Sequence, residues 1–194
     1  MTRLFRSILL GVVCALAAAP LWAAERPRLA VLTDIGGDPD DQQSLVRLMV
    51  YANEFEIEAF IASASGTPGE LKQAVTRPDL IREIIGGYEH VLPNLKEHAD
   101  GWPEPDALRQ RVKSGNPQRG RKHIGKGHDT EGSRFLIERI DAGLPPRRLN
   151  IVIWGGQTDL ARIGLVCAGE GAAGVAEQLA LDQRLGQGGA VQGD

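Results

Sequence analysis

Hydrophobic and polar positions alternate in blocks along this chain, and the blocks predict alternating strands and helices. The apolar run RLAVLT, Arg28–Thr33, lacks strict alternation, which is typical of a strand buried on both faces. Residues 40–54 carry apolar positions at helical spacing and predict an amphipathic helix, and residues 55–65 predict the next strand. A strand, a helix and a strand in this order predict a βαβ unit with a parallel strand pair.

The middle of the chain predicts mainly helix. In TRPDLIREIIGG, residues 76–87, Pro78 is typical of a first helical turn, and Gly86 and Gly87 are typical of a helix end. Three later prolines predict that the following stretch is divided into short helices: Pro93, Pro103 and Pro105.

The second half of the chain repeats the alternation once more. Residues 113–133 predict a long polar loop, residues 134–143 a helix that ends at Gly143, and Leu149–Trp154 another buried strand. The sequence GGQTDLA after this strand leads into a further helix. We therefore expect an α/β fold with an open, doubly wound, mainly parallel sheet of three strands.

Composition agrees with one soluble domain. The chain has 194 residues, of which 42% are hydrophobic and 24% charged, and its net charge of −3 argues against a general nucleic-acid binder.

The first 24 residues follow the plan of a secretory signal peptide, with two arginines, an apolar run and small residues where a peptidase would cut. The apolar run is shorter than a membrane span of about 20 residues, and Val13 before Cys14 argues against a lipoprotein site. We expect a periplasmic or secreted protein without a stable membrane anchor after cleavage. Cys167 would then be the one remaining cysteine, which excludes an intramolecular disulfide.

Four aspartates crowd the loop after the first predicted strand: Asp34, Asp38, Asp40 and Asp41. Ligands of open α/β sheets bind at the carboxyl ends of the strands, where this loop lies. Crowded carboxylates raise one another's pKa unless a cation offsets their charge, and Ca²⁺ and Mg²⁺ take oxygen ligands of this kind. A structural alternative is that the last two aspartates cap the helix and the others are solvated; an EF-hand and a phosphate loop fit the spacing poorly.

Several segments together resemble the nucleoside hydrolase superfamily, and most closely its exported, cellulose-binding, nucleoside-hydrolase-like branch. They are TDIGGDPDDQQS, ASGTPGELK, VTRPDLIREI, GHDTEGS and NIVIWGGQTDLA, which follow in this order over about residues 26–161. The resemblance implies that Asp34 and Asp41 bind Ca²⁺, that Thr158 adds its main-chain oxygen, and that Asp40 binds sugar hydroxyls or helps to hold the metal. It also implies that Asp34 is the general base toward water in the hydrolysis of an N-glycosidic or related glycosyl bond.

The segment GHDTEGS is similar to a loop on the substrate side of the family, so His128 or Glu131 could contact a sugar or its leaving group. Equally, Asp129 or Thr130 could simply cap the next helix. The basic residues of the run 119–126 could attract anionic groups, but we expect a solvated loop.

From Gly164 the chain becomes rich in Ala and Gly, and we expect an aberrant or disordered tail over 164–194 after a domain at 26–163. We further expect that a reading-frame change or truncated gene model leaves out another metal-binding aspartate that the family supplies later. The partners expected are a glycoside or nucleoside, or a polysaccharide. The alternatives to a hydrolase are a non-catalytic carbohydrate-binding protein and an inactive fragment.

Overall fold

The computed structural model of this chain describes residues 25–65, 74–143 and 147–167, with the last three as backbone alone. The predicted signal peptide and all but the first residues of the predicted tail lie outside these ranges. Among the helices within them, none has the length and apolar character needed to cross a membrane.

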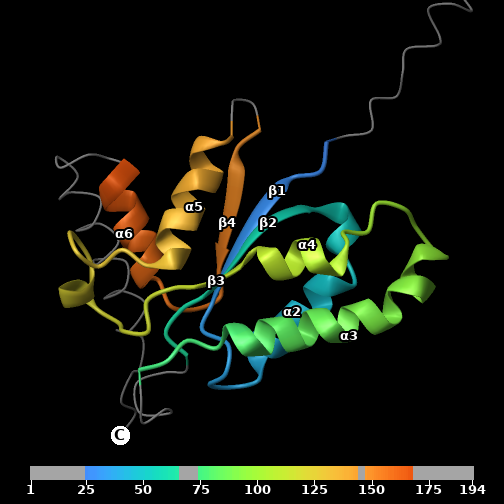
Figure 1. Cartoon of the computed structure of the whole chain (residues 1–194), viewed down its shortest axis with the longest axis horizontal. Coiled ribbons are helices and arrows are strands. Elements are labelled where there is room, and N and C mark those ends of the chain that lie inside the picture. Colours follow the sequence, from blue (N-terminus) through green and yellow to red (C-terminus); the bar gives the residue numbers. More distant parts are fainter. Residues whose placement is uncertain (1–24, 66–73, 144–146, 168–194) are drawn as a thin grey trace, which may run out of the picture.

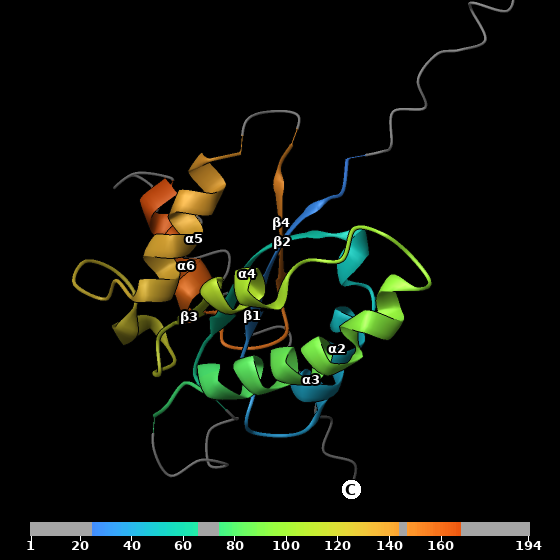
Figure 2. The ribbon, with the colours of Figure 1, turned by 45° about the vertical axis from the view of Figure 1, so that its right-hand side comes forward.

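Four parallel strands form one sheet in the order β3-β2-β1-β4. Helices cover both of its faces (Figure 1), and a 45° turn of the molecule shows the same layering (Figure 2). The strands are β1 (Arg28–Thr33), β2 (Glu56–Ala62), β3 (Val112–Ser114) and β4 (Leu149–Ile153). One face of the sheet is covered by α2 (Asp40–Met49), α3 (Pro78–Lys96) and α4 (Pro105–Gln110). The other face is covered by α5 (Glu131–Asp141) and α6 (Thr158–Cys167). Two short 3₁₀ helices are η1 (Ala52–Glu54) and η2 (Arg121–His123). The predicted α/β doubly wound parallel sheet is confirmed, with four strands rather than three.

Alternation along β1 divides the core into two layers. Leu29 and Val31 face α2, α3 and α4, whereas Ala30 and Leu32 face α5 and α6. All six residues of β1 are buried, as the unbroken apolar run predicted.

A bulge in β2 gives the sheet a buried ion pair. The register with β1 skips Glu58, since Leu29 pairs with Ile57 and Ala30 pairs with Ala59. The Glu58 carboxylate accepts hydrogen bonds from the Arg28 guanidinium, with both side chains at most 10% exposed. Arg28 also donates to the Arg139 carbonyl oxygen at 2.6 Å, so this pair joins the start of β1 to α5.

The predicted helix end at Gly86 and Gly87 is wrong, because α3 runs through both glycines and through Pro93 to Lys96, over 19 residues in all. A Cβ at either glycine would meet only open space, so the glycines do not mark a tight turn. Each glycine costs about 1 kcal/mol in a helix, whereas each large apolar side chain buried on the sheet contributes about 1.5–3 kcal/mol. The buried side chains of α3 outweigh this cost: Ile81, Ile85, Tyr88 and Leu92.

The predicted loop 113–133 begins inside a strand, because Val112–Ser114 pairs with Phe60–Ala62 as β3. Three residues with one apolar side chain carry no periodic signal. The predicted cap at the end of this loop is confirmed at Thr130, whose Oγ1 accepts from the Ser133 amide at 2.9 Å in a capping box. Helix α6 runs to Cys167 and so crosses the expected domain boundary at residue 163.

Candidate metal and active site

The aspartate loop lies where the sheet reverses its direction of growth. From β1 the chain adds β2 and then β3 on one side, and it returns to the other side of β1 to add β4. Strands β1 and β4 are neighbours, but the chain leaves β1 toward α2 on one face of the sheet and leaves β4 toward α6 on the other face. A crevice therefore lies between these two connections. In an open α/β sheet, this crevice is where ligands bind.

Asp41 is the buried carboxylate of this crevice. It lies in the first turn of α2 at 4% exposure, and Oδ2 accepts a hydrogen bond from Thr33 Oγ1 at the end of β1. Burial raises the pKa of Asp41 to about 6, and the Thr33 hydroxyl acts in the opposite direction. The charge of Asp34 and a hydrogen bond with it raise this pKa further. The structure thus brings Asp34 and Asp41 together, as predicted.

Two glycines let the end of β4 approach Asp34 closely. A Cβ on Gly155 would lie 2.0 Å from Asp34 Oδ1, and a Cβ on Gly156 would lie 1.8 Å from Ser63 Oγ. Ser63 Oγ lies 3.1 Å from the carbonyl oxygens of both Thr33 and Gly155, and it therefore ties the ends of β1, β2 and β4 together. The backbone after β4 thus forms a wall against the Asp34 carboxylate.

Arg119 supplies a positive charge that the sequence did not place here. Its Nη2 donates to Asp34 Oδ2 at 2.7 Å and to the Ala64 carbonyl oxygen at 2.8 Å. We predicted that the basic run containing Arg119 was a solvated loop, and for this residue the prediction is wrong. A single arginine in a long polar loop gives no sequence signal that it folds back onto a strand end 85 positions earlier.

Asp40 faces solvent at the start of α2. Its Oδ1 accepts the Asp41 amide at 2.8 Å, and hydrogen bonding with Asp38 is the largest cause of its lowered pKa. Asp40 therefore satisfies one amide of the helix N-terminus, which agrees with the helix-capping alternative for this residue. Its exposure also leaves it open to a ligand.

Thr158 is buried at 6% exposure and begins α6. Three residues before it, Gly155 packs against the Asp34 carboxylate, so Thr158 directly follows the backbone wall of the crevice. Its role as a main-chain metal ligand stays a prediction.

The two predicted substrate contacts, His128 and Glu131, lie at and just before the start of α5. Both are exposed. The His128 ring lies edge-on to that of His123 at 6.0 Å, and Glu131 pairs with Lys113 at 3.1 Å. These contacts join the loop to itself and to β3.

Sequence reasoning missed Asp159, which is 1% exposed. Its carboxylate accepts the Asn116 amide and the Thr130 hydroxyl, each at 2.7 Å, and burial raises its pKa. Asp159 thus joins α6 to the loop after β3 and to the cap of α5. The signal available in the sequence was an aspartate in the first turn of a helix, which normally indicates a cap alone.

The donor set fits a divalent cation in part. Ca²⁺ takes six to eight oxygen ligands, and Asp34 and Asp41 offer carboxylate oxygens from one crevice. Within the described ranges, no group of three or more His, Cys, Asp or Glu residues could hold a metal ion.

Comparison with known proteins places this chain in a family. The family model described as "Cellulose-binding Sde182, nucleoside hydrolase-like domain" matches residues 28–166. The chain belongs to this family. A search of curated proteins gives no match to this chain.

A solved structure agrees with the assignment to the Sde182-type nucleoside hydrolase-like family. It is described as a nucleoside hydrolase-related hypothetical protein from Saccharophagus degradans that is associated with carbohydrate metabolism, and it matches with a TM-score of 0.64 at 35% identity. The match covers 71% of this chain and 32% of the other. The chain therefore spans about a third of that relative's length.

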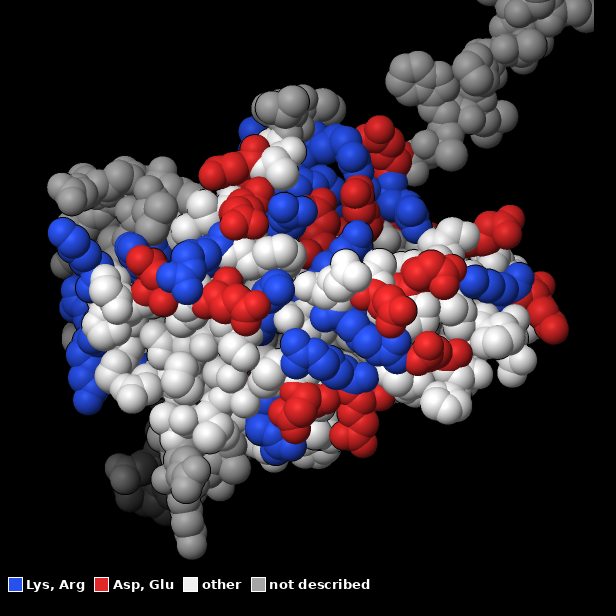
Figure 3. All heavy atoms as spheres, in the orientation of Figure 1, with Lys and Arg blue, Asp and Glu red and all other residues white. Residues whose placement is uncertain are grey.

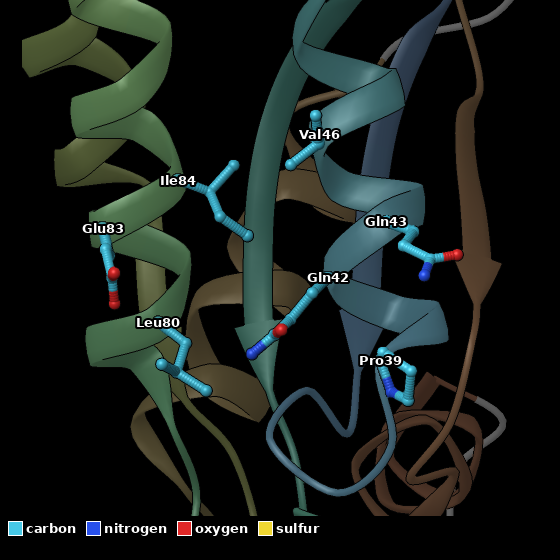
Figure 4. Close-up of a pocket in the computed structure, with 7 residues that line it drawn as sticks. All are labelled: Pro39, Gln42, Gln43, Val46, Leu80, Glu83 and Ile84. Carbon is cyan, nitrogen blue, oxygen red and sulfur yellow. The ribbon is translucent and has the colours of Figure 1, made fainter.

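A groove opens between α2 and α3 beside the aspartate loop of this Sde182-type domain (Figure 4). Its volume of 480 Å³ lies within the range of small-molecule sites. Gln42, Leu80 and Ile84 point into the space between the two helices. The lining mixes apolar and uncharged polar side chains with one carboxylate: Pro39, Gln42, Gln43, Val46, Leu80, Glu83 and Ile84. On the face shown in Figure 3, acidic and basic side chains are interspersed.

Proposed function

We propose that this domain binds Ca²⁺ through Asp34 and Asp41 and hydrolyses a glycosyl bond, with a glycoside or nucleoside as substrate. The observation that carries the proposal is the pair of carboxylates at the reversal point of the sheet, where burial and mutual charge raise the pKa of Asp41 to about 6. Such a pair is stabilised by a proton or by a cation.

Each side chain then has a defined task. Asp34, whose side chain is 19% exposed, is the general base that takes a proton from the attacking water. Asp41 holds the second ligand position from the rigid first turn of α2, and the exposed Asp40 accepts hydrogen bonds from sugar hydroxyls. A bound Ca²⁺ would supply orientation of water and electrostatic stabilisation.

Calorimetric titration of the purified chain with CaCl₂ tests the metal site. We expect saturable binding that is lost in Asp34→Asn and in Asp41→Asn. Asp100→Asn is the matched control, because Asp100 is exposed and lies at the other end of the sheet. The carbonyl oxygen of its neighbour Gly101 accepts a hydrogen bond from Arg26, just before the start of β1, whereas the aspartate loop follows the end of β1. If the wild type and all three variants give the same heat, the metal site is wrong.

A second candidate is carbohydrate binding without hydrolysis. It is favoured by the ion pair of Arg119 with Asp34, because the Asp34 oxygen that contacts the guanidinium is not free to contact an attacking water. The family description also carries the words cellulose-binding. Retention on cellulose without release of sugar from nucleosides or glycosides would favour this candidate, whereas Asp34-dependent release would favour the hydrolase.

A further inference from the structure

The position of Arg119 is fixed by the loop that carries it. Asn116 Oδ1 accepts the Gln118 amide at 2.9 Å, and Asn116 Nδ2 donates to the His123 carbonyl oxygen at 3.1 Å. The Asn116 amide in turn donates to the buried Asp159 at 2.7 Å. The Asn116 side chain therefore holds the loop on both sides of Arg119, and the Asn116 amide anchors it to α6 through Asp159.

One guanidinium nitrogen joins two strand ends. Nη2 of Arg119 lies 2.7 Å from Asp34 Oδ2, after β1, and 2.8 Å from the Ala64 carbonyl oxygen, after β2. The side chains of Arg119 and Asp34 are 32% and 19% exposed, so water screens the pair incompletely. A hydrogen bond between two charged groups is stronger than one between neutral groups.

A divalent cation bound by the same carboxylate would stand close to this guanidinium. Like charges repel, and the repulsion is larger where exposure is low. The Asp34 carboxylate also lies against the Gly155 backbone, which leaves little room for the carboxylate to turn away from Arg119.

We propose that Arg119 is the resident counter-ion of Asp34, that it is released when a divalent cation binds, and that it thereby sets the affinity of the site for that cation. The inference rests on the proposed function for the identity of the ion. Arg119 and Ca²⁺ then compete for the Asp34 carboxylate.

The test is calorimetric titration of the full chain with CaCl₂. Arg119→Gln is expected to bind Ca²⁺ about tenfold more tightly than the wild type, because the ion no longer replaces a charged hydrogen bond. Arg121→Gln is the matched control: it removes the same charge from an exposed position of the same loop, and its affinity is expected to stay within about twofold of the wild type. Arg119→Met is made alongside, so that the result does not depend on the folding of one variant.

Arg119→Lys separates charge from shape and is expected to bind close to the wild type. Equal affinity of the wild type, Arg119→Gln and Arg119→Met would overturn the inference while leaving the Ca²⁺ site in place. Weaker binding by both neutral variants would also overturn it, since Arg119 would then support the ion. Absence of binding in all of these proteins would overturn the inference together with the proposed function.

Discussion

At the scale of single residues, the carboxyl group of Asp41 is held where ionisation is unfavourable. Burial raises its pKa to about 6, well above the value near 4 expected in the unfolded chain. Between about pH 4 and pH 6, the folded protein therefore keeps a proton on Asp41 that the unfolded chain has already lost. The stability that this proton contributes is fully present below about pH 4 and is lost as the pH rises through about 6.

Asp41→Asn should remove this dependence in calcium-free buffer, because an amide does not titrate. The difference in unfolding free energy between the wild type and Asp41→Asn is expected to change by about 2 kcal/mol between pH 4 and pH 7, with the wild type losing stability. Urea unfolding at each pH measures it. A constant difference would show that the Asp41 pKa is close to its ordinary value.

Gly155 is a position where the site requires the absence of a side chain. Gly155→Ala would place a Cβ 2.0 Å from Asp34 Oδ1, and the short Asp34 side chain cannot move aside without leaving the crevice. We expect a loss of about 1–3 kcal/mol in stability and a weakening of Ca²⁺ binding by tenfold or more. Gly87→Ala, in open space on α3, is the matched control and is expected to be neutral or stabilising by up to about 1 kcal/mol. Thermal unfolding and calorimetry measure both effects, and equal behaviour of the two variants would contradict the close packing at Gly155.

At the scale of elements, the bulge in β2 makes the start of the sheet depend on one ion pair. Glu58→Ala would leave Arg28 buried at 5% exposure without its carboxylate partner, so we expect a loss of about 3–5 kcal/mol in unfolding free energy. Glu104→Ala breaks the exposed pair with Lys96 and should cost less than about 1 kcal/mol. Chemical denaturation compares the two variants, and similar losses would mean that burial does not distinguish the pairs.

The sequence predicted the strands that form continuous apolar runs. Strand β1 appears at its predicted bounds, and β4 ends one residue before its predicted end. Local signals failed where packing decided the outcome, as in α3, which passes through two glycines and a proline because one face is buried on the sheet. The carboxylate pair was predictable because Asp34 and Asp41 are close in sequence, in one loop at the end of β1. Arg119 and Asp159 were not, because their partners lie in segments far away along the chain.

At the scale of the whole molecule, β4 is a sheet edge among the described residues and is only partly covered. Its residues are partly buried or exposed, and the apolar ones are Leu149, Ile151, Val152 and Ile153. An edge of this kind pairs readily with another chain. We therefore expect poor solubility and self-association that increases with concentration, measured by sedimentation velocity. A single monomeric species at all concentrations would contradict this expectation.

The proposed function of the whole domain depends on a cation between Asp34 and Asp41. The most direct measurement is a crystal structure of the chain grown with CaCl₂, with an anomalous difference map calculated at the aspartate loop. We predict a peak at about 2.3–2.6 Å from oxygens of both carboxylates, with the Arg119 guanidinium withdrawn from Asp34. A map without a peak at saturating Ca²⁺, with Arg119 still bound to Asp34, would contradict it.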